Sequence, residues 1–325
     1  MFKEENQKNL ILAIVISIAI VLGWQFLVEA PRLDRERVQR AAQQQQQAAA
    51  PAAQSSPSIV ATPGAPVAVP DRAAAVSQSP RVKIDTPEVR GSIRLVGAQI
   101  DDLQLVRYRE TVSPSSPLIT LLSPQGSPSP YFAEFGWVAN GTPGAMPDGQ
   151  TAWVADRETL TPTTPVTLSW DNGAGLKFQR RIAIDADFMF EITDRVSNGG
   201  TEPVQLQPYG RVQRVGLPKT LGFYILHEGP IGVFNGVLNE PSYDDIKKKR
   251  AIKTPSTGGW LGITDKYWLV ALVPDQKSEI QTQFLHVDLG GRDAFGDGLV
   301  HGGKDSRTRL PTQSLRLNAS STGTP

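Results

Sequence analysis

The stretch LKFQRRIAI, residues 176 to 184, alternates large apolar and polar side chains along its length. One face carries Leu176, Phe178, Ile182 and Ile184, and the opposite face carries Lys177, Gln179 and Arg181. Successive side chains of a β-strand point to opposite faces, so this pattern predicts a strand with one buried face. VTLSW precedes it through the turn DNGAG, and FMFEITDRV follows it with the same alternation. We therefore expect an antiparallel meander from about residue 166 to residue 196.

Similar alternating runs, separated by Gly, Pro, Asn and Asp, recur between residues 81 and 286. The further candidates are residues 89–96, 99–106, 118–122, 131–138, 204–215, 267–273 and 280–285. About ten strands without a long amphipathic helix predict a mainly β fold, a large antiparallel sandwich. Roughly 200 residues is a suitable size for one such domain with a substantial core.

One short segment, SYDDIKKKR at residues 242–250, favours a helix or an irregular surface turn. Asp244 and Asp245 stand near its start and basic residues near its end, which suits the helix dipole. The segment is either a solvated surface feature or a basic contact for anionic lipid or a partner protein. In the second case Lys247, Lys248 and Lys249 are the contact residues.

The N-terminal run Leu10 to Val28, LILAIVISIAIVLGWQFLV, predicts a transmembrane helix because it would cover roughly 28 Å of bilayer. It is longer than the apolar region of a signal peptide, and Pro31 follows the small-residue site Val28-Glu29-Ala30, so we expect it to be retained. Residues 1–9 precede this span. Two lysines before it and four arginines soon after it leave the orientation undecided by charge alone.

Two segments show no strand pattern. Residues 29–80 are rich in Ala, Gln, Pro and Ser, and they cannot bury enough apolar surface to offset the entropy of ordering, which predicts a flexible linker. Residues 287–325 are Gly-rich and polar and contain no apolar run long enough to span lipid, so an irregular tail is expected there.

The composition excludes several classes of function. The formal net charge is +1, which provides no global field for nucleic acid. The chain has no Cys and three separated His, so neither a thiolate site nor a histidine-based metal site is expected. Because no phosphate-binding glycine loop is present either, we expect no cofactor.

Two segments admit a functional interpretation beside a structural one. In GGWLGITDKYW, residues 258–268, Gly258 and Gly259 permit a close backbone approach, and Trp260, Tyr267 and Trp268 are either a plug of the sandwich core or a peptide-binding groove. His227-Glu228 admits an acid/base pair, although a surface turn is the commoner explanation.

Four stretches, in this order, resemble the YidC membrane protein insertase family (YidC/Oxa/Alb) in its form with a large periplasmic domain. They are MFKEENQKNLILAIVISIAIVLGWQFL at 1–27, GSIRLVGAQIDDLQLVRYRET at 91–111, KTLGFYILHEGPIGVFNGVLNEPSYDDIKKK at 219–249 and GGWLGITDKYWLVALVPDQ at 258–276. The resemblance covers about residues 1 to 286, and we expect the native-like sequence to end near residues 286 to 293.

The resemblance implies a bacterial inner membrane protein with residues 1–9 in the cytoplasm and a β-supersandwich domain, residues 81–286, in the periplasm. It implies a non-enzymatic role in the insertion and folding of nascent integral membrane proteins, with or without the Sec translocon, in contact with the lipid bilayer. Such insertases cross the membrane five more times after this domain, whereas this chain shows no further span, so we expect it to carry the anchor and the periplasmic domain only. The alternatives are a bitopic periplasmic carbohydrate-binding or mutarotase-like protein and a structural envelope scaffold.

Overall fold

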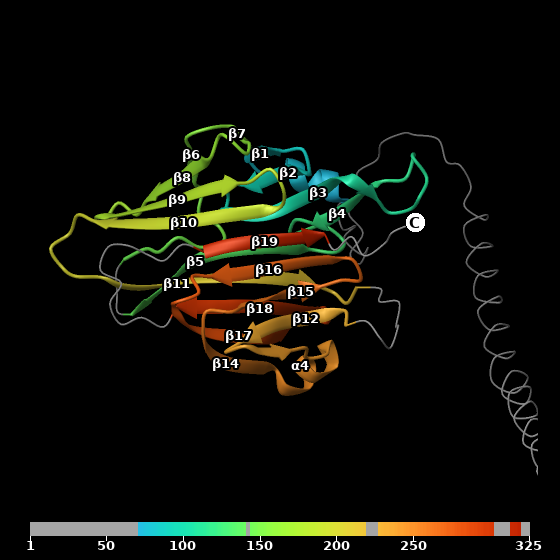
Figure 1. Cartoon of the computed structure of the whole chain (residues 1–325). Helices are drawn as coiled ribbons and strands as arrows, with labels where there is room; N and C mark the ends of the chain where they lie inside the picture. The colour runs from blue at the N-terminus through green and yellow to red at the C-terminus, as the bar shows by residue number, and fades with distance from the viewer. Residues whose placement is uncertain (1–70, 141–143, 219–226, 302–312, 320–325) are drawn as a thin grey trace, which may run out of the picture. The chain divides into compact units, whose positions relative to one another are not determined.

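The computed structural model describes residues 71–140, 144–218, 227–301 and 313–319 (Figure 1). The predicted cytoplasmic N-terminus (1–9), the transmembrane helix (10–28) and the linker up to residue 70 lie outside the described residues. Neither of the helices within the described ranges has the length and apolar character needed to span a bilayer.

Two β-sheets make up the domain, and the predicted mainly β fold is confirmed. The ten-stranded sheet has the order β14 (Ala251–Thr257), β17 (Glu279–Asp288), β18 (Asp293–His301), β11 (Gln205–Val215), β5 (Tyr131–Asn140), β3 (Gln99–Arg109), β2 (Val89–Arg94), β1 (Arg81–Asp85) and β7 (Thr159–Leu160), with β4 (Leu118–Leu122) paired to β3. The nine-stranded sheet has the order β13 (Val237–Asn239), β12 (Gly229–Phe234), β15 (Trp260–Thr264), β16 (Trp268–Pro274), β19 (Gln313–Ala319), β10 (Met189–Asn198), β9 (Leu176–Ile184), β8 (Val166–Asp171) and β6 (Val154–Ala155). Strand pairs are antiparallel except for β1 with β7.

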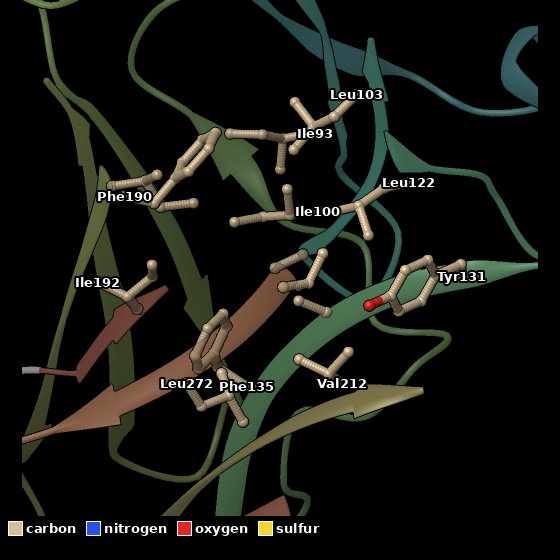
Figure 2. Packing of buried hydrophobic residues seen from close by; sticks show 14 of the residues in the cluster. Ile93, Ile100, Leu103, Leu122, Tyr131, Phe135, Phe190, Ile192, Val212 and Leu272 are labelled. Atoms are coloured by element: carbon tan, nitrogen blue, oxygen red, sulfur yellow. The ribbon is translucent and has the colours of Figure 1, made fainter. Parts of the chain in front are cut away.

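The hydrophobic core lies between the two sheets (Figure 2). Phe190 and Ile192 of β10 face Ile93 of β2 and Ile100 of β3 across it, all essentially inaccessible to solvent. Burying side chains of this size contributes about 1.5 to 3 kcal/mol each. Tyr131 of β5 adds a polar link, because its hydroxyl donates to the Ile263 carbonyl of the other sheet at 3.3 Å.

The predicted meander is confirmed as β8, β9 and β10, paired in sequence order. Burial along β9 alternates as the sequence indicates, since its odd-numbered members are the exposed or half-buried ones. Arg180 is the one charged residue on the buried face of β9, where the other residues are apolar, and it is fully buried.

The last ten residues of the predicted linker are ordered, so the prediction of a flexible linker through residue 80 is wrong for them. Helix α3 (Arg72–Ser77) begins at Asp71, whose side chain accepts from the Ala74 N–H at 2.7 Å. Arg72 forms an ion pair with Asp102 of β3, and Ala75 is buried. Composition could not reveal this contact because the acidic partner lies in a strand that follows later in the chain.

The predicted irregular tail is also wrong, because residues 287–325 contain the end of β17, all of β18 and all of β19. β18 is hydrogen-bonded on both sides, to β17 and β11, and β19 lies between β16 and β10. A strand with two partners gains its backbone hydrogen bonds from its neighbours, so Gly296 and Gly298 do not prevent it from forming.

Candidate interaction surfaces

Helix α4 (Tyr243–Lys249) occupies the segment for which the sequence favours a short helix. Ser242 and Asp245 form a reciprocal cap: the Ser242 hydroxyl accepts from the Asp245 N–H at 3.1 Å, and the Asp245 carboxylate accepts from the Ser242 N–H at 3.3 Å. Tyr243 and Ile246 are buried against the sandwich. The helix is therefore anchored through one face and presents its charged residues to solvent.

The predicted contact lysines differ in their partners. Lys247 Nζ lies 2.7 Å from Asp293 Oδ2 at the start of β18. Lys248 and Lys249 are exposed, as is Arg250, which ends the helix with a φ of 63°. A positive φ favours glycine, so an arginine at this position carries a conformational cost.

The three predicted aromatic residues do not form one cluster. Trp260 begins β15, whereas Tyr267 and Trp268 follow the turn at the far end of that strand, about 13 Å along it. The Trp268 ring contacts Tyr108 of β3 edge to face, with ring centroids 5.0 Å apart, and lies 6.4 Å from the Tyr267 ring. Half-exposed Tyr267 and half-buried Trp268 thus remain a candidate contact without Trp260.

The close approach predicted for the glycine pair is present. Gly259 has a φ of 86°, and a Cβ atom there would lie 2.1 Å from the Val233 carbonyl oxygen. Only glycine fits such a position, and this lets β15 begin directly beside β12.

A buried polar network joins α4 to the turn between β15 and β16. Arg214 of β11 forms two hydrogen bonds with the Asp265 carboxylate, at 2.7 and 2.6 Å, and a third with the Tyr243 hydroxyl at 3.2 Å. Its guanidinium also lies 4.1 Å from the Tyr131 ring centroid. Burial raises the pKa of Tyr243 to about 12, so its hydroxyl stays protonated. The helix and the turn are therefore fixed at the same end of the sandwich.

A groove of about 470 Å³ lies on the face of the ten-stranded sheet that points away from the core. Its floor is β18, where Gly296 and Gly298 have no side chains and the Arg211 side chain packs over both of them. Lys253 of β14 and Gln283 of β17 pair across the sheet with each other, and Gly298 pairs with both Gln283 and Arg211 of β11. These four residues form a row across four strands.

The residues beside this row give the groove a mixed chemistry. Gln281 and Gln283 offer side-chain amides that both donate and accept hydrogen bonds, and Leu285 and Val300 offer apolar contact. Arg211 is paired with Glu134 of β5 at 2.6 Å. Side-chain amides and aliphatic groups of this kind suit an extended polypeptide.

Neither glycine of the floor is required by the backbone. Neither has a positive φ, and a Cβ atom at Gly298 would meet its nearest neighbour, the Gly210 carbonyl oxygen, at an ordinary 3.4 Å. Glycine in a strand weakens it by about 0.5 to 1 kcal/mol. Here the missing Cβ atoms make room for the Arg211 side chain, whose Cδ atom lies 3.6 Å from where a Cβ of Gly296 would be. The groove was not predicted because residues 287–325 were expected to be irregular; the alternating glycines of Gly-Asp-Gly were the available signal.

His227 lies just before β12, and its Nε2 is 2.8 Å from the Pro230 carbonyl oxygen. This contact fixes the turn into the strand, which supports the structural interpretation of His227-Glu228. Within the described ranges, no group of three or more His, Asp or Glu residues is placed to bind a metal ion.

The two β-sheets packed against each other define a large β-sandwich domain, which carries a groove on the outer face of its ten-stranded sheet. The chain belongs to the YidC periplasmic domain family, whose profile matches residues 81–301. The predicted resemblance is confirmed, but its predicted end near residues 286 to 293 is too early, since the match continues through β18.

The similar proteins are membrane protein insertases named YidC. That of Bradyrhizobium diazoefficiens is 45% identical over 301 residues, covering 88% of this chain and 49% of the relative. That of Methylobacterium nodulans is 45% identical over 304 residues, covering 89% and 50%. That of Granulibacter bethesdensis is 45% identical over 312 residues, covering 91% and 51%. The chain spans about half the length of the curated relatives it matches.

Similar solved structures are more distant. The Slr1438 protein from Synechocystis sp. PCC 6803 gives a TM-score of 0.45 at 7% identity, covering 75% of this chain and 97% of that one. A putative mutarotase (YeaD) from Salmonella typhimurium gives a TM-score of 0.39 at 10% identity, covering 73% and 90%. At these scores the likeness carries no argument about function, and family membership favours the insertase interpretation over the carbohydrate-binding one.

Proposed function

We propose that this chain acts in the insertion and folding of integral membrane proteins, as the anchored periplasmic part of a YidC-type insertase. In this proposal residues 10–28 span the bacterial inner membrane with residues 1–9 in the cytoplasm, and the domain meets nascent membrane proteins and Sec translocon components. The observation that supports the proposal is the identity of about 45% to YidC insertases across most of the chain. A non-enzymatic role follows from the proposed activity, since insertion makes and breaks no covalent bond.

The groove on the ten-stranded sheet is where we propose that the domain contacts a client. An extended segment would lie in the groove over β17 and β18, beside the side chains of Gln281, Gln283 and Arg211. The amides of Gln281 and Gln283 would bond to its peptide groups, and Leu285 would contact its apolar side chains. Such contacts are largely independent of client sequence, as a general insertion factor requires.

Site-specific photo-crosslinking tests this proposal. A photoreactive amino acid replaces Gln283 in the groove or, as the matched control, exposed Lys177 on β9 of the other sheet. During synthesis of a membrane protein with a periplasmic loop, we expect adducts with the nascent chain from position 283 and not from position 177. Equal labelling at both positions, or none at 283, would contradict a client site in the groove.

A depletion experiment tests the wider function. One helix cannot enclose the hydrophilic path that offsets the desolvation of polar groups crossing lipid. In cells depleted of their own insertase, residues 1–325 alone should therefore fail to restore client insertion. Restoration by this chain alone would refute the proposed division of labour.

A further inference from the structure

Three segments carry exposed aliphatic or basic side chains near α4: the end of β11, the turn after β17 and the end of α4 itself. Helix α4 lies beside β14 and β17 (Figure 1). The apolar members are Leu217, Val287 and Leu289, which are 56%, 41% and 49% exposed. The basic members are Lys248, Lys249 and Arg250 at the end of α4. We refer to these six residues as the basic-apolar end.

Backbone and side-chain bonds around Asp293 place these segments side by side. The Asp293 carboxylate binds Lys247 of α4, and its carbonyl accepts from the Gly216 N–H, next to Leu217, at 2.7 Å. The His286 N–H donates to the Arg250 carbonyl at 2.9 Å, so Val287 adjoins the end of the helix. The six residues therefore belong to one surface although they come from three parts of the chain.

The charges on this surface are unequally engaged. The carboxylate of Asp245 caps α4, that of Asp293 binds Lys247 and His286, and that of Asp288 accepts from the Gly291 N–H at 2.7 Å. Asp244 is exposed beside them. For Lys248, Lys249 and Arg250 no ion pair is found among the described residues, so consecutive cations are available to an external anion.

The backbone of Arg250 supports a role for its charge. Its φ of 63° with a ψ of −41° lies outside the regions that a residue with a Cβ atom ordinarily adopts. When a residue with an unfavourable backbone conformation carries a charge, a function for that charge can be inferred. The backbone at this position would favour glycine, yet the sequence has an arginine there.

From these observations we infer that the basic-apolar end docks on an anionic lipid surface, with the three cations against headgroups and the aliphatic side chains at the acyl boundary. The groove described above ends at Leu285 and does not include this surface, and a lipid surface needs charge and small apolar insertions rather than a shaped pocket. Residues 29–70, if a coil as the sequence predicts, span on average about 35 Å, which keeps the domain close to the membrane. Weak contacts then suffice, because anchoring makes docking intramolecular. The inference depends on the predicted anchor and not on the proposed insertase activity.

Contact with lipid can be measured directly because the chain has no Cys. Leu289→Cys carries an environment-sensitive dye in the full chain, reconstituted into vesicles that contain headgroup spin-labelled lipid as a short-range quencher. Val154→Cys on β6, 71% exposed at an edge of the other sheet, is the matched control. We expect quenching at position 289 in vesicles of phosphatidylcholine with phosphatidylglycerol, less in phosphatidylcholine alone, and none at position 154.

Charge variants decide between lipid docking and mere proximity. Each cation near an anionic surface favours binding to that surface. Removing two of them lowers the equilibrium constant for docking about 30-fold. Lys248→Glu/Lys249→Glu should therefore abolish quenching at 289, and Lys177→Glu should not. Arg250→Gly removes a charge while relieving the backbone, so its expected loss of quenching cannot come from unfolding. Quenching at 289 that ignores lipid charge and all of these variants, or that equals position 154, would overturn the inference.

Discussion

Removing the buried Arg180 guanidinium should cost the domain a large share of its stability. Arg180 of β9 is fully buried and forms two hydrogen bonds with Asp194 of β10, at 2.8 and 2.9 Å. A third bond, at 2.9 Å, reaches the Phe135 carbonyl of the opposite sheet. The guanidinium also lies 5.0 and 5.5 Å from the Trp137 and Trp153 rings. This side chain links the two sheets through one charge.

The expected magnitude follows from what Arg180→Met leaves behind. Asp194, 5% exposed, would keep a buried charge without its partner, and breaking such a pair costs about 3 to 5 kcal/mol. For a domain of this size, about 4 kcal/mol lowers Tm by about 8 to 16 °C. In Arg180→Met/Asp194→Leu the unpaired charge is gone, so the double variant should recover about 2 to 3 kcal/mol relative to the sum of the single variants.

Urea denaturation of the full chain in detergent, followed by tryptophan fluorescence, measures these values, because Trp137 and Trp153 contact the substituted side chain. Lys177→Met on the same strand is the matched control: its ion pair with Asp171 is exposed and spans 3.5 Å, so the midpoint should not change. A loss below about 1 kcal/mol for Arg180→Met, or strict additivity in the double variant, would refute the argument.

Three further features can each be tested by substitution and thermal or urea unfolding. Asp297 of β18 is fully buried, and among the described residues neither of its carboxylate oxygens has a hydrogen-bond partner. Burial raises its pKa well above the ordinary value, so folding takes up a proton and stability is lost as pH rises from about 4. Asp297→Asn should therefore be more stable than the parent chain from pH 5 to pH 8 and equal to it near pH 4, and a variant less stable at pH 8 would contradict this. Arg250→Gly should raise the free energy of unfolding by about 0.5 to 1 kcal/mol because glycine relieves the positive φ. Lys248→Gly, inside α4, is the control and should lower it by about 1 kcal/mol. Changes of the same sign in both variants would be inconsistent with strain at Arg250. Gly259→Ala should destabilise by more than about 2 kcal/mol, because its Cβ would collide with the Val233 carbonyl oxygen, and a neutral effect would exclude the close approach.

The sequence by itself determined the strands whose apolar side chains alternate. β4 has the predicted bounds, β11 differs by one residue, and the meander of β8, β9 and β10 lies where the pattern indicates it. The α4 segment was equally readable, because its cap, its acidic start and its basic end are local signals. Four stretches with a family resemblance were sufficient to identify the family.

Only the tertiary structure decided what depends on partners distant in the chain. β18 and β19 exist because neighbouring strands bond to both of their edges, and α3 is ordered because Arg72 meets Asp102, thirty residues later. Trp260 is separated from Tyr267 by the length of β15, although the two residues are close in the sequence. The groove arises from Lys253, Gln283, Gly298 and Arg211, which share a row only after four strands pair. Periodicity reports which face a side chain takes, whereas long-range pairing decides which side chains share that face.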